Sequence, residues 1–400
     1  MKRTLITLAL IAFVAAGGFL GALSLEHNSD VTLPPPSGQL PVGRTIADWK
    51  DAAHNDPMAP PGTPRELLVW IWYPSQQSAA LDEYEPSTHA PELPFKGPLI
   101  LRPLNPVFKL LTTDYSKVHG HSLHEPPVSA QQASYPVVLM RGGASGQVRN
   151  YTTLAEDVAS HGYVVVGIDA AYRTGRVVFP DGRSIEERPE NNPEMFEGEA
   201  LFKLGEKLAD AWAADMSFVV DRLEQLNASD ERFRGKLDLQ KIGAFGHSLG
   251  GAEALEFCHN DSRCKAVINV DGAPWGKVVT DGLSQPVLFF MSDHSGDRAD
   301  AEAETIGTNF GSLFPKTPKG TWLMIKGSNH FMFSDDAVLK SRMILGALKR
   351  LGILKVDARR QLAITTHYTS GYFDAALAGK AGSPPLLSAD YPEIQTFALK

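Results

Sequence analysis

The chain carries the motif Gly-His-Ser-Leu-Gly at residues 246–250, directly after an apolar run at residues 241–245. A helix-favouring stretch from Gly251 to Cys258 follows the motif. Between a strand and a helix, Gly-x-Ser-x-Gly is typical of a sharp turn that presents a serine hydroxyl at the N-terminus of the helix. The residues two before and two after the serine have almost no room for a side chain, which glycine satisfies. The pattern therefore predicts an exposed nucleophile at Ser248 rather than an ordinary small-residue turn.

Apolar runs alternate with helix-favouring segments along the rest of the chain. The strand-like runs lie at residues 65–74, 136–140, 163–168, 242–245, 266–270, 286–291 and 321–325. The helix-favouring segments lie at residues 151–161, 201–226, 251–258, 335–351 and 358–378. Strands that are apolar throughout and alternate with helices predict a parallel sheet with helices on both faces. We therefore expect an α/β fold with a mostly parallel central sheet.

Composition and charge limit the class of protein. The 400 residues are 43% hydrophobic, which is enough for a large core. The formal net charge is −8 and no lysine or arginine cluster resembles a nucleic-acid footprint, so nucleic-acid binding is excluded. The chain has no Cys-x-x-Cys or other zinc spacing, and its glycine-rich stretch at residues 142–146 lacks the lysine of a phosphate-binding loop. We therefore expect no metal and no cofactor.

The N-terminus predicts export. Residues 1–3 are Met-Lys-Arg, and residues 4–25 are almost wholly apolar or small. This pattern fits a signal peptide or an uncleaved signal anchor over residues 1–25, so we expect a periplasmic or secreted protein, either free or anchored to the inner membrane by residues 4–25. Two proline-rich stretches predict a linker over residues 26–64, which leaves residues 65–400 as the catalytic domain.

Two cysteines also favour an oxidising compartment. Cys258 and Cys264 flank a short polar turn, and the chain contains no other cysteine. A disulfide between them would contribute ~2 kcal/mol of stability if unstrained. The pair predicts an exported protein, whereas two unrelated thiols are the alternative.

A serine needs an adjacent base to take its proton, and the usual base is histidine. His330 follows the last strand-like run, in Gly-Ser-Asn-His-Phe at residues 327–331. In folds with this kind of serine turn, the histidine comes after the serine and the acid in the chain, in a loop after the last strand. His247 lies inside the turn and cannot bend back to Ser248, and His294 follows an earlier strand. We therefore expect His330 to be the base.

Two aspartates could orient that histidine. Asp271 ends the strand after the serine turn, and Asp293 ends the following strand. Each could present a carboxylate from the same sheet edge, where it would hold the imidazole tautomer and stabilise the imidazolium. The residues alone leave both candidates open.

Acyl transfer also needs hydrogen-bond donors for an oxyanion. The first donor expected is the backbone N–H of Leu249, directly after the serine. The second should come from the glycine-rich loop after the strand at residues 136–140, where we expect Gly143 and, as next choice, Ala144. Each such donor is typically worth ~3 kcal/mol of transition-state stabilisation.

The block at residues 173–200 lies between a strand and its helix. An Asp-Gly turn within residues 177–183 predicts a hairpin there. The acidic, proline-rich remainder predicts either a lid over the site or a solvated surface loop.

With these residues in place, the chain resembles the platelet-activating-factor acetylhydrolase family of α/β-hydrolases (the plasma or isoform II type), in its bacterial exported branch. The resemblance runs from about residue 65 to the C-terminal helix and rests on Trp72-Tyr73-Pro74, Ala159-Ser160-His161-Gly162-Tyr163, Val178-Phe179-Pro180-Asp181-Gly182-Arg183, Gly246-His247-Ser248-Leu249-Gly250-Gly251, Asp271-Gly272-Ala273-Pro274-Trp275 and Gly327-Ser328-Asn329-His330-Phe331. It implies an α/β-hydrolase fold and an acid on the strand next after the serine turn, which favours Asp271 over Asp293.

One position departs from the family pattern. Family members often carry Ser-His-Gly before the oxyanion donor, whereas residues 140–142 here are Met-Arg-Gly. Arg141 places a cation near the site, where it would contact an anionic group or a lid acid such as Glu187, or point away.

The expected function is hydrolysis of carboxylic esters through an acyl-serine intermediate without a cofactor. The resemblance implies short acyl groups, as in acetylated phospholipid-like lipids. A polyester depolymerase or a peptidase would use the same residues, since a fold does not define a substrate. A non-catalytic binding protein of the same fold is the remaining alternative.

Overall fold

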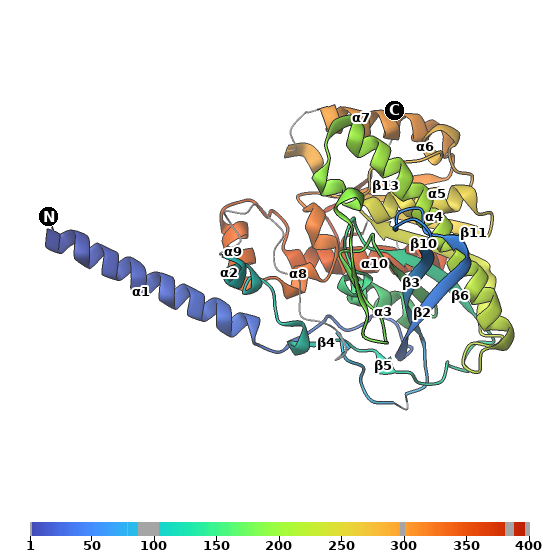
Figure 1. Ribbon diagram of the computed structural model, residues 1–400, viewed down its shortest axis with the longest axis horizontal. Helices are drawn as coiled ribbons and strands as arrows, with labels where there is room; N and C mark the ends of the chain where they lie inside the picture. Colours follow the sequence, from blue (N-terminus) through green and yellow to red (C-terminus); the bar gives the residue numbers. More distant parts are fainter. Residues whose placement is uncertain (1, 78, 87–103, 297–300, 381–387, 397–400) are drawn as a thin grey trace.

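The computed structural model describes residues 2–77, 79–86, 104–296, 301–380 and 388–396 (Figure 1). Its central sheet consists of β2 (Val42–Asn55), β3 (Pro64–Pro74), β5 (Leu123–His124), β6 (Tyr135–Arg141), β7 (Val164–Ala170), β10 (Leu237–His247), β11 (Cys264–Val270), β12 (Val287–Met291), β13 (Gly320–Ile325) and β14 (Ile394–Thr396). The order across this sheet is β14-β13-β12-β11-β10-β6-β7-β3-β2-β5. Neighbouring strands from β13 to β7 run parallel, while β14 and β3 pair antiparallel with the two ends of that block.

Two small strand pairs lie outside the central sheet. They are β1 (Val31–Thr32) with β4 (Val118–His119), and β8 (Arg176–Val178) with β9 (Ser184–Glu186). The α-helices are α1 (Lys2–His27), α2 (Asn105–Lys109), α3 (Thr152–Ser160), α4 (Gly198–Ser229), α5 (Leu249–Asn260), α6 (Val278–Asp281), α7 (Ala301–Leu313), α8 (Asp336–Leu339), α9 (Arg342–Arg350) and α10 (Ala358–Ala376).

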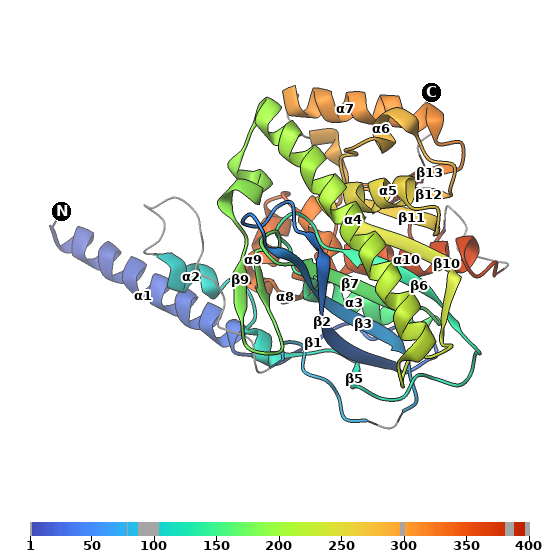
Figure 2. The same cartoon turned by 45° about the vertical axis from the view of Figure 1, so that its right-hand side comes forward.

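The apolar strands bury both faces of the sheet. Along β6, Val138 and Met140 pack in the cluster that includes α3 and α10, whereas Val137 and Leu139 pack in the cluster that includes α4 and α5. Successive side chains of a strand point to opposite faces, so a strand covered on both sides must be apolar at every position. Figure 2 shows α4 lying across one face of this sheet. The predicted α/β-hydrolase arrangement of a mostly parallel sheet between helices is confirmed.

The segment predicted as a linker differs from the expectation. Residues 42–55 form β2, which pairs with β3 over most of its length and belongs to the central sheet. The exposed residues of this strand lie from Lys50 onward, and polar and apolar residues are mixed along its length. It therefore gives little of the apolar signal on which a strand prediction depends. The central sheet therefore already includes residues 42–55, within the segment predicted as a linker.

The helix expected over residues 335–351 is two helices. Lys340 is extended between α8 and α9, and the Ser341 side chain accepts a hydrogen bond from the N–H of Ile344 at 3.4 Å. A serine side chain that accepts from the backbone three residues later caps the start of a helix. Ser341 therefore begins a second helix, and the predicted segment is divided at this residue.

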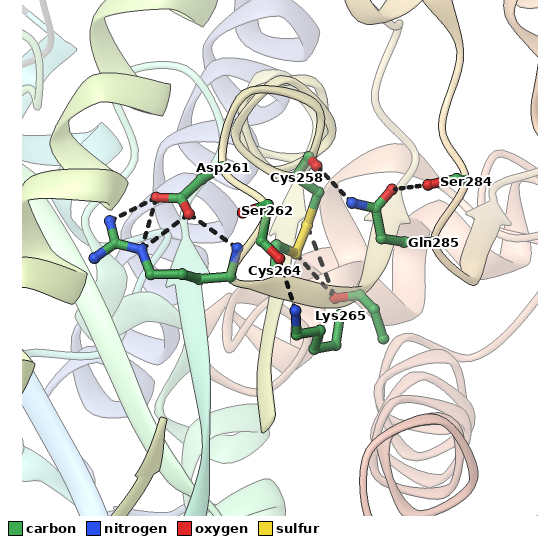
Figure 3. Close-up of a disulfide and its surroundings, with 9 residues drawn as sticks. Cys258, Asp261, Ser262, Cys264, Lys265, Ser284 and Gln285 are labelled. Carbon is green, nitrogen blue, oxygen red and sulfur yellow. Dashed lines mark hydrogen bonds and ion pairs between the residues drawn. A yellow bond between two sulfur atoms is a disulfide. The ribbon is translucent and has the colours of Figure 1, made fainter. Parts of the chain in front are cut away.

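The two cysteines form a disulfide (Figure 3). It closes the turn between the end of α5 and the start of β11, and both cysteines are buried. The predicted pairing is confirmed, and so short a loop contributes ~2 kcal/mol by restricting the unfolded chain.

The predicted hairpin at residues 177–183 is present as β8 and β9. Its turn residue Gly182 has a φ of +85°, which glycine adopts without strain. Arg183 forms ion pairs with Glu66 and Asp48, which ties the hairpin to strands β3 and β2.

Candidate active site

Ser248 stands at the junction of β10 and α5 with φ 55° and ψ −128°. This region costs a non-glycine residue about 1–3 kcal/mol and persists only where neighbouring structure imposes it. The imposing contacts are close: a Cβ on Gly246 would lie 2.1 Å from the carbonyl oxygen of Gly250, and a Cβ on Gly250 would lie 2.3 Å from that of Gly142. Both glycines of the motif are therefore required sterically.

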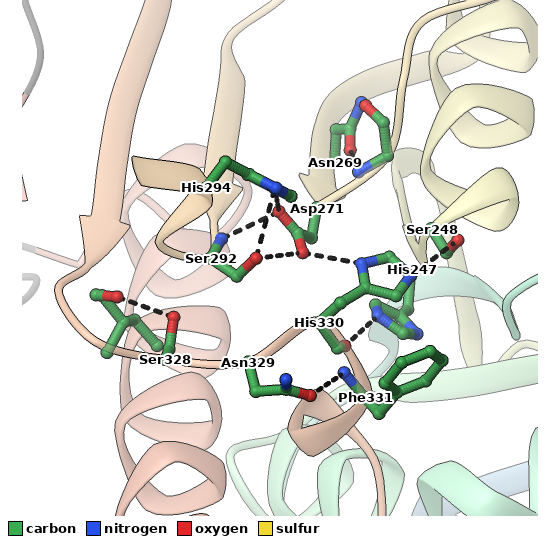
Figure 4. Close-up of polar contacts among 12 residues, drawn as sticks. His247, Ser248, Asn269, Asp271, Ser292, His294, Ser328, Asn329, His330 and Phe331 are labelled. Atoms are coloured by element: carbon green, nitrogen blue, oxygen red, sulfur yellow. Dashed lines mark hydrogen bonds and ion pairs between the residues drawn. The ribbon is translucent and has the colours of Figure 1, made fainter. Parts of the chain in front are cut away.

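The serine meets a histidine and an aspartate (Figure 4). His330 Nε2 lies 3.1 Å from Ser248 Oγ, and His330 Nδ1 lies 2.7 Å from Asp271 Oδ2. Since a carboxylate only accepts, His330 carries its proton on Nδ1 and offers Nε2 as acceptor to the serine hydroxyl. The structure thus brings together three of the residues predicted from the sequence, each from the carboxyl end of a different strand.

Asp271 is the most heavily hydrogen-bonded side chain of the site. Its Oδ1 accepts from the N–H of Ser292 at 2.8 Å and lies 2.8 Å from His294 Nε2, while its Oδ2 accepts from the Ser292 hydroxyl at 2.6 Å and from His330. Burial raises the pKa of Asp271, but the hydrogen bonds from His294 and His330 outweigh it and hold that pKa well below the usual range. The carboxyl group therefore stays ionised, as an orienting acid must.

Asp293, the alternative acid, lies apart from the histidine. Its Oδ2 accepts the N–H of Gly327 at 2.7 Å, and its Oδ1 accepts the N–H of Ser295 at 3.1 Å. It thus supports the loop that leads to His330 instead of contacting the imidazole.

The loop bearing His330 is held from a second side. Gln361 on α10 accepts from the N–H of Asn329 at 2.9 Å and donates to the carbonyl of the same residue at 2.7 Å. The Asn329 side chain in turn accepts from the N–H of Phe331 at 3.0 Å. These bonds define where the imidazole stands.

His247 connects the base with the glycine-rich loop. Its Nε2 lies 2.8 Å from the carbonyl oxygen of His330, and its Nδ1 lies 2.8 Å from the Tyr151 hydroxyl. Burial, with His330 nearby, lowers the pKa of His247 to about 3, so the ring is neutral. It therefore donates through Nε2–H and accepts from Tyr151 at Nδ1.

The hydrogen bond between His247 and Tyr151 continues to Gly143 in the glycine-rich loop. The Gly143 N–H donates to the Tyr151 hydroxyl at 3.2 Å, although a Cβ on Gly143 would lie only 3.0 Å from the Ser248 Cβ. The expected oxyanion donor is close to the serine, but its N–H has another acceptor. Ala144, the next choice, is the other candidate donor of this loop. Leu249 is the first residue of α5, where N–H groups have no partner within the helix.

Several contacts were not anticipated from the sequence. The sequence predicts no role for Ser292 or Tyr151, and for His294 it excludes only the role of base. The signal available for His294 and Ser292 was their place directly after a strand that neighbours β11, because parallel strands bring their carboxyl ends to one sheet edge. Arg141 does not contact Glu187, whose carboxylate instead accepts from the Ser145 hydroxyl.

The fold and this geometry together define an α/β-hydrolase with a serine–histidine–aspartate cluster. Residues 25–177 and 218–378 match the family described as platelet-activating factor acetylhydrolase, isoform II. This match covers more than half of the chain, so the chain belongs to that family. It is an esterase-type hydrolase.

Individual relatives agree with the family. The chain is 26% identical over 393 residues to a probable 1-alkyl-2-acetylglycerophosphocholine esterase of Arthroderma benhamiae, covering 93% of this chain and 95% of the relative. It is 24% identical over 268 residues to the platelet-activating factor acetylhydrolase of Cavia porcellus, covering 62% and 59% of the two chains. Among solved structures, the ferulic acid esterase of Streptomyces cinnamoneus superposes with a TM-score of 0.73 at 25% identity, covering 92% of this chain and 100% of that one.

The geometry gives different predictions for the two candidate acids. Asp271→Asn should lower turnover on a short-chain ester by about 10⁴-fold, the size of the effect of the same change in a serine protease triad, because the wrong histidine tautomer is then favoured. Asp293→Asn should cost only a few-fold, since it alters a loop contact. Circular dichroism checks that both variants fold, and a larger loss in Asp293→Asn would contradict the assignment.

The neutral state of His247 predicts a pH dependence of stability. Between its ordinary pKa of 6.5 and the lowered value of about 3, the unfolded chain binds a proton at this residue and the folded protein does not. The free energy of unfolding should therefore fall as pH falls through this window, by at most about 1.4 kcal/mol per pH unit from this group. His247→Gln should lose stability less steeply than the wild type in urea denaturation between pH 6.5 and 4.5. A constant difference between the two proteins across that range would contradict the prediction.

Proposed function

We propose that this protein hydrolyses carboxylic esters through an acyl-enzyme intermediate on Ser248. The observation that carries the proposal is the continuous hydrogen-bonded path from the serine hydroxyl through His330 to the ionised Asp271. The family to which the chain belongs supports the same class of reaction.

The proposed reaction has two halves. Ser248 Oγ attacks the ester carbonyl while its proton passes to His330 Nε2, and Asp271 stabilises the imidazolium that forms. His330 then protonates the leaving alcohol as the tetrahedral intermediate collapses to the acyl-serine. A water molecule, deprotonated by His330, attacks the acyl group, and the collapse of the second intermediate releases the carboxylic acid and restores the serine hydroxyl.

Two backbone N–H groups are the proposed oxyanion donors. They belong to Leu249, at the N-terminus of α5, and to Ala144, in the loop after β6. The peptide between Gly143 and Ala144 supports this choice, because its carbonyl accepts the Gly146 N–H inside the turn, at 2.5 Å. In a trans peptide the N–H points opposite to the carbonyl, so the Ala144 N–H faces out of the turn.

The substrate class we propose is an ester with a short acyl group, as in acetylated phospholipids. The names of the Arthroderma and Cavia relatives support this class. The site is open to water, since the His330 side chain is 31% exposed and the neighbouring Phe331 is 65% exposed. Water must reach the acyl-serine for the second half of the reaction.

Ser248→Ala and His330→Ala should each lower turnover by several orders of magnitude with the fold intact. The double variant should be little worse than either single variant, because the residues act as a unit. A fluorescent alkyl phosphonate should label wild-type protein and not Ser248→Ala. Near-normal esterase activity in folded Ser248→Ala would refute the mechanism.

A panel of esters tests the substrate class with the same protein. Acetyl esters should be turned over faster than long-chain, feruloyl, polyester-film and peptide-amide substrates. A preference for polymer film or for amides would favour one of the alternative enzymes, and a protein that neither labels nor turns over any ester would favour a binding role.

We propose further that α1 is retained as a membrane anchor of an exported protein. Within the described part of the chain, one helix, over Ile6–His27, is long and apolar enough to span a bilayer. The disulfide supports an extracytoplasmic location. Figure 1 shows α1 projecting away from the body, with only its last turns against it.

Those last turns form part of the folded domain. Leu23 and His27 are buried, and the His27 ring nitrogen Nδ1 lies 2.6 Å from the carbonyl oxygen of Thr112. The Glu26 carboxylate accepts from the Ser341 hydroxyl and from the N–H of Met343 at the start of α9. A carboxylate at a helix N-terminus stabilises it, so removing this turn would remove a cap from α9.

The anchor proposal predicts how the protein fractionates. Full-length protein should remain with membranes in carbonate and be released by detergent, and its intact mass should include α1. Removing residues 1–20 should give soluble protein of unchanged activity, while removal through His27 should cost about 1 kcal/mol of stability through the lost cap. A mature N-terminus within or beyond residues 2–27 in the native host would contradict retention.

A further inference from the structure

Arg141 is a fully buried cation directly below the proposed oxyanion loop. It is the last residue of β6 and pairs in the sheet with Gly246 of the serine turn. A guanidinium without exposed surface must find its polar partners inside the protein, so its contacts show what it holds in place.

The guanidinium binds the loop from inside. Its Nη2 donates to the carbonyl of Ala144 at 2.9 Å, and its Nη1 donates to the carbonyl of Gly146 at 3.2 Å. These two carbonyls belong to the turn in which the Gly146 N–H donates to the carbonyl of Gly143. Ala144 has a φ of +31°, a conformation that a residue with a Cβ keeps only when its surroundings hold it there.

The other contacts of the same guanidinium reach the helices behind the site. Its Nε lies 3.2 Å from a carboxyl oxygen of Glu253, a close contact without hydrogen-bond geometry, and both side chains are completely buried. Burial raises the pKa of Glu253 to about 8, and the nearby Arg141 charge opposes that rise. Glu253 lies on α5, one turn after Leu249. The guanidinium also stacks on Trp212 of α4, with its Cζ 3.5 Å from the ring centre. A planar guanidinium can make directed hydrogen bonds and stack at the same time, which a lysine ammonium cannot.

One side chain therefore connects the two elements that carry the proposed oxyanion donors. Leu249 begins α5, whose Glu253 side chain lies against the Arg141 guanidinium, and Ala144 lies in the turn whose carbonyls Arg141 binds. Donors for a developing oxyanion contribute most when their position is set before the reaction, because no reorganisation is then needed.

We propose that Arg141 is a positioning residue that holds the turn at residues 143–146 in register with the N-terminus of α5, and so determines the geometry of the oxyanion site. It touches no reacting atom and acts through the backbone of Ala144. This inference rests on the proposed function and adds to it the group on which oxyanion stabilisation depends.

The test compares Arg141→Lys with Arg173→Lys. Arg173 is also fully buried and lies 4.6 Å from the same Trp212 ring, but its ion pairs are with Asp56 and Asp215 and not with the loop. Both variants keep a charge and lose a guanidinium contact with the Trp212 ring, so the control accounts for general destabilisation.

Three quantities are measured per active site, with sites counted by total phosphonate labelling of Ser248. In Arg141→Lys, kcat on an acetyl ester should fall by about 10- to 100-fold with KM nearly unchanged, a smaller loss than removal of an oxyanion donor, because the donor is displaced. Affinity for an alkylboronic acid, which forms a tetrahedral adduct on the serine, should fall by the same factor. Arg173→Lys should change neither kcat nor that affinity beyond a few-fold.

Equal kcat in the two variants, or a lower kcat with unchanged boronate affinity, would overturn the positioning role. If Arg141→Lys does not fold, Arg141→Gln, which is uncharged, shorter and lacks the guanidinium fork, is measured at low temperature with the same expectations. Wild-type protein that fails to label at Ser248 would instead overturn the proposed function, so the two failures are distinguishable.

Discussion

The close approach of β10, Ser248 and α5 is the constraint on which the site depends. The backbone of Gly246 comes so near to Gly250 that a single added carbon would overlap it, and Ser248 is held at a positive φ as a result. This strained turn places the serine hydroxyl at the edge of the sheet and the start of α5 beside it. The loop after β6, which contains Ala144, and the loop after β13, which contains His330, both approach this serine.

Asp271 provides a second constraint, of a different kind. Four donors surround its carboxylate, one of them from His330 and three from Ser292 and His294. A buried charge is tolerated only when it is paired and hydrogen-bonded, so these donors hold the acid in place and keep it ionised. The base is held in turn by Gln361 and His247 through the backbone around it. The side chains of the site are thus positioned mainly by residues that would not touch a substrate.

Much of the fold could be predicted from the sequence because the parallel strands are buried on both faces. Their apolar runs are continuous, and the helices between them have a clear period. Strand β2 could not be predicted because polar and apolar residues are mixed along it and it has no continuous apolar run. The contacts of Arg141 and Tyr151 could not be predicted from the sequence either. An arginine or tyrosine near a glycine-rich loop looks the same in the sequence whether its side chain points inward or to solvent.

The sequence by itself determined the serine turn and the place of the histidine, because both depend on local order along the chain: a strand, two glycines around a serine, and a histidine after the last parallel strand. Only the tertiary structure decided between Asp271 and Asp293. Both end neighbouring parallel strands, and no local pattern tells which carboxylate reaches the imidazole. His330 reaches from the loop after β13 to Ser248 at the end of β10, and there it meets Asp271 at the end of the neighbouring β11. Asp293, at the end of β12, instead binds the backbone of Gly327.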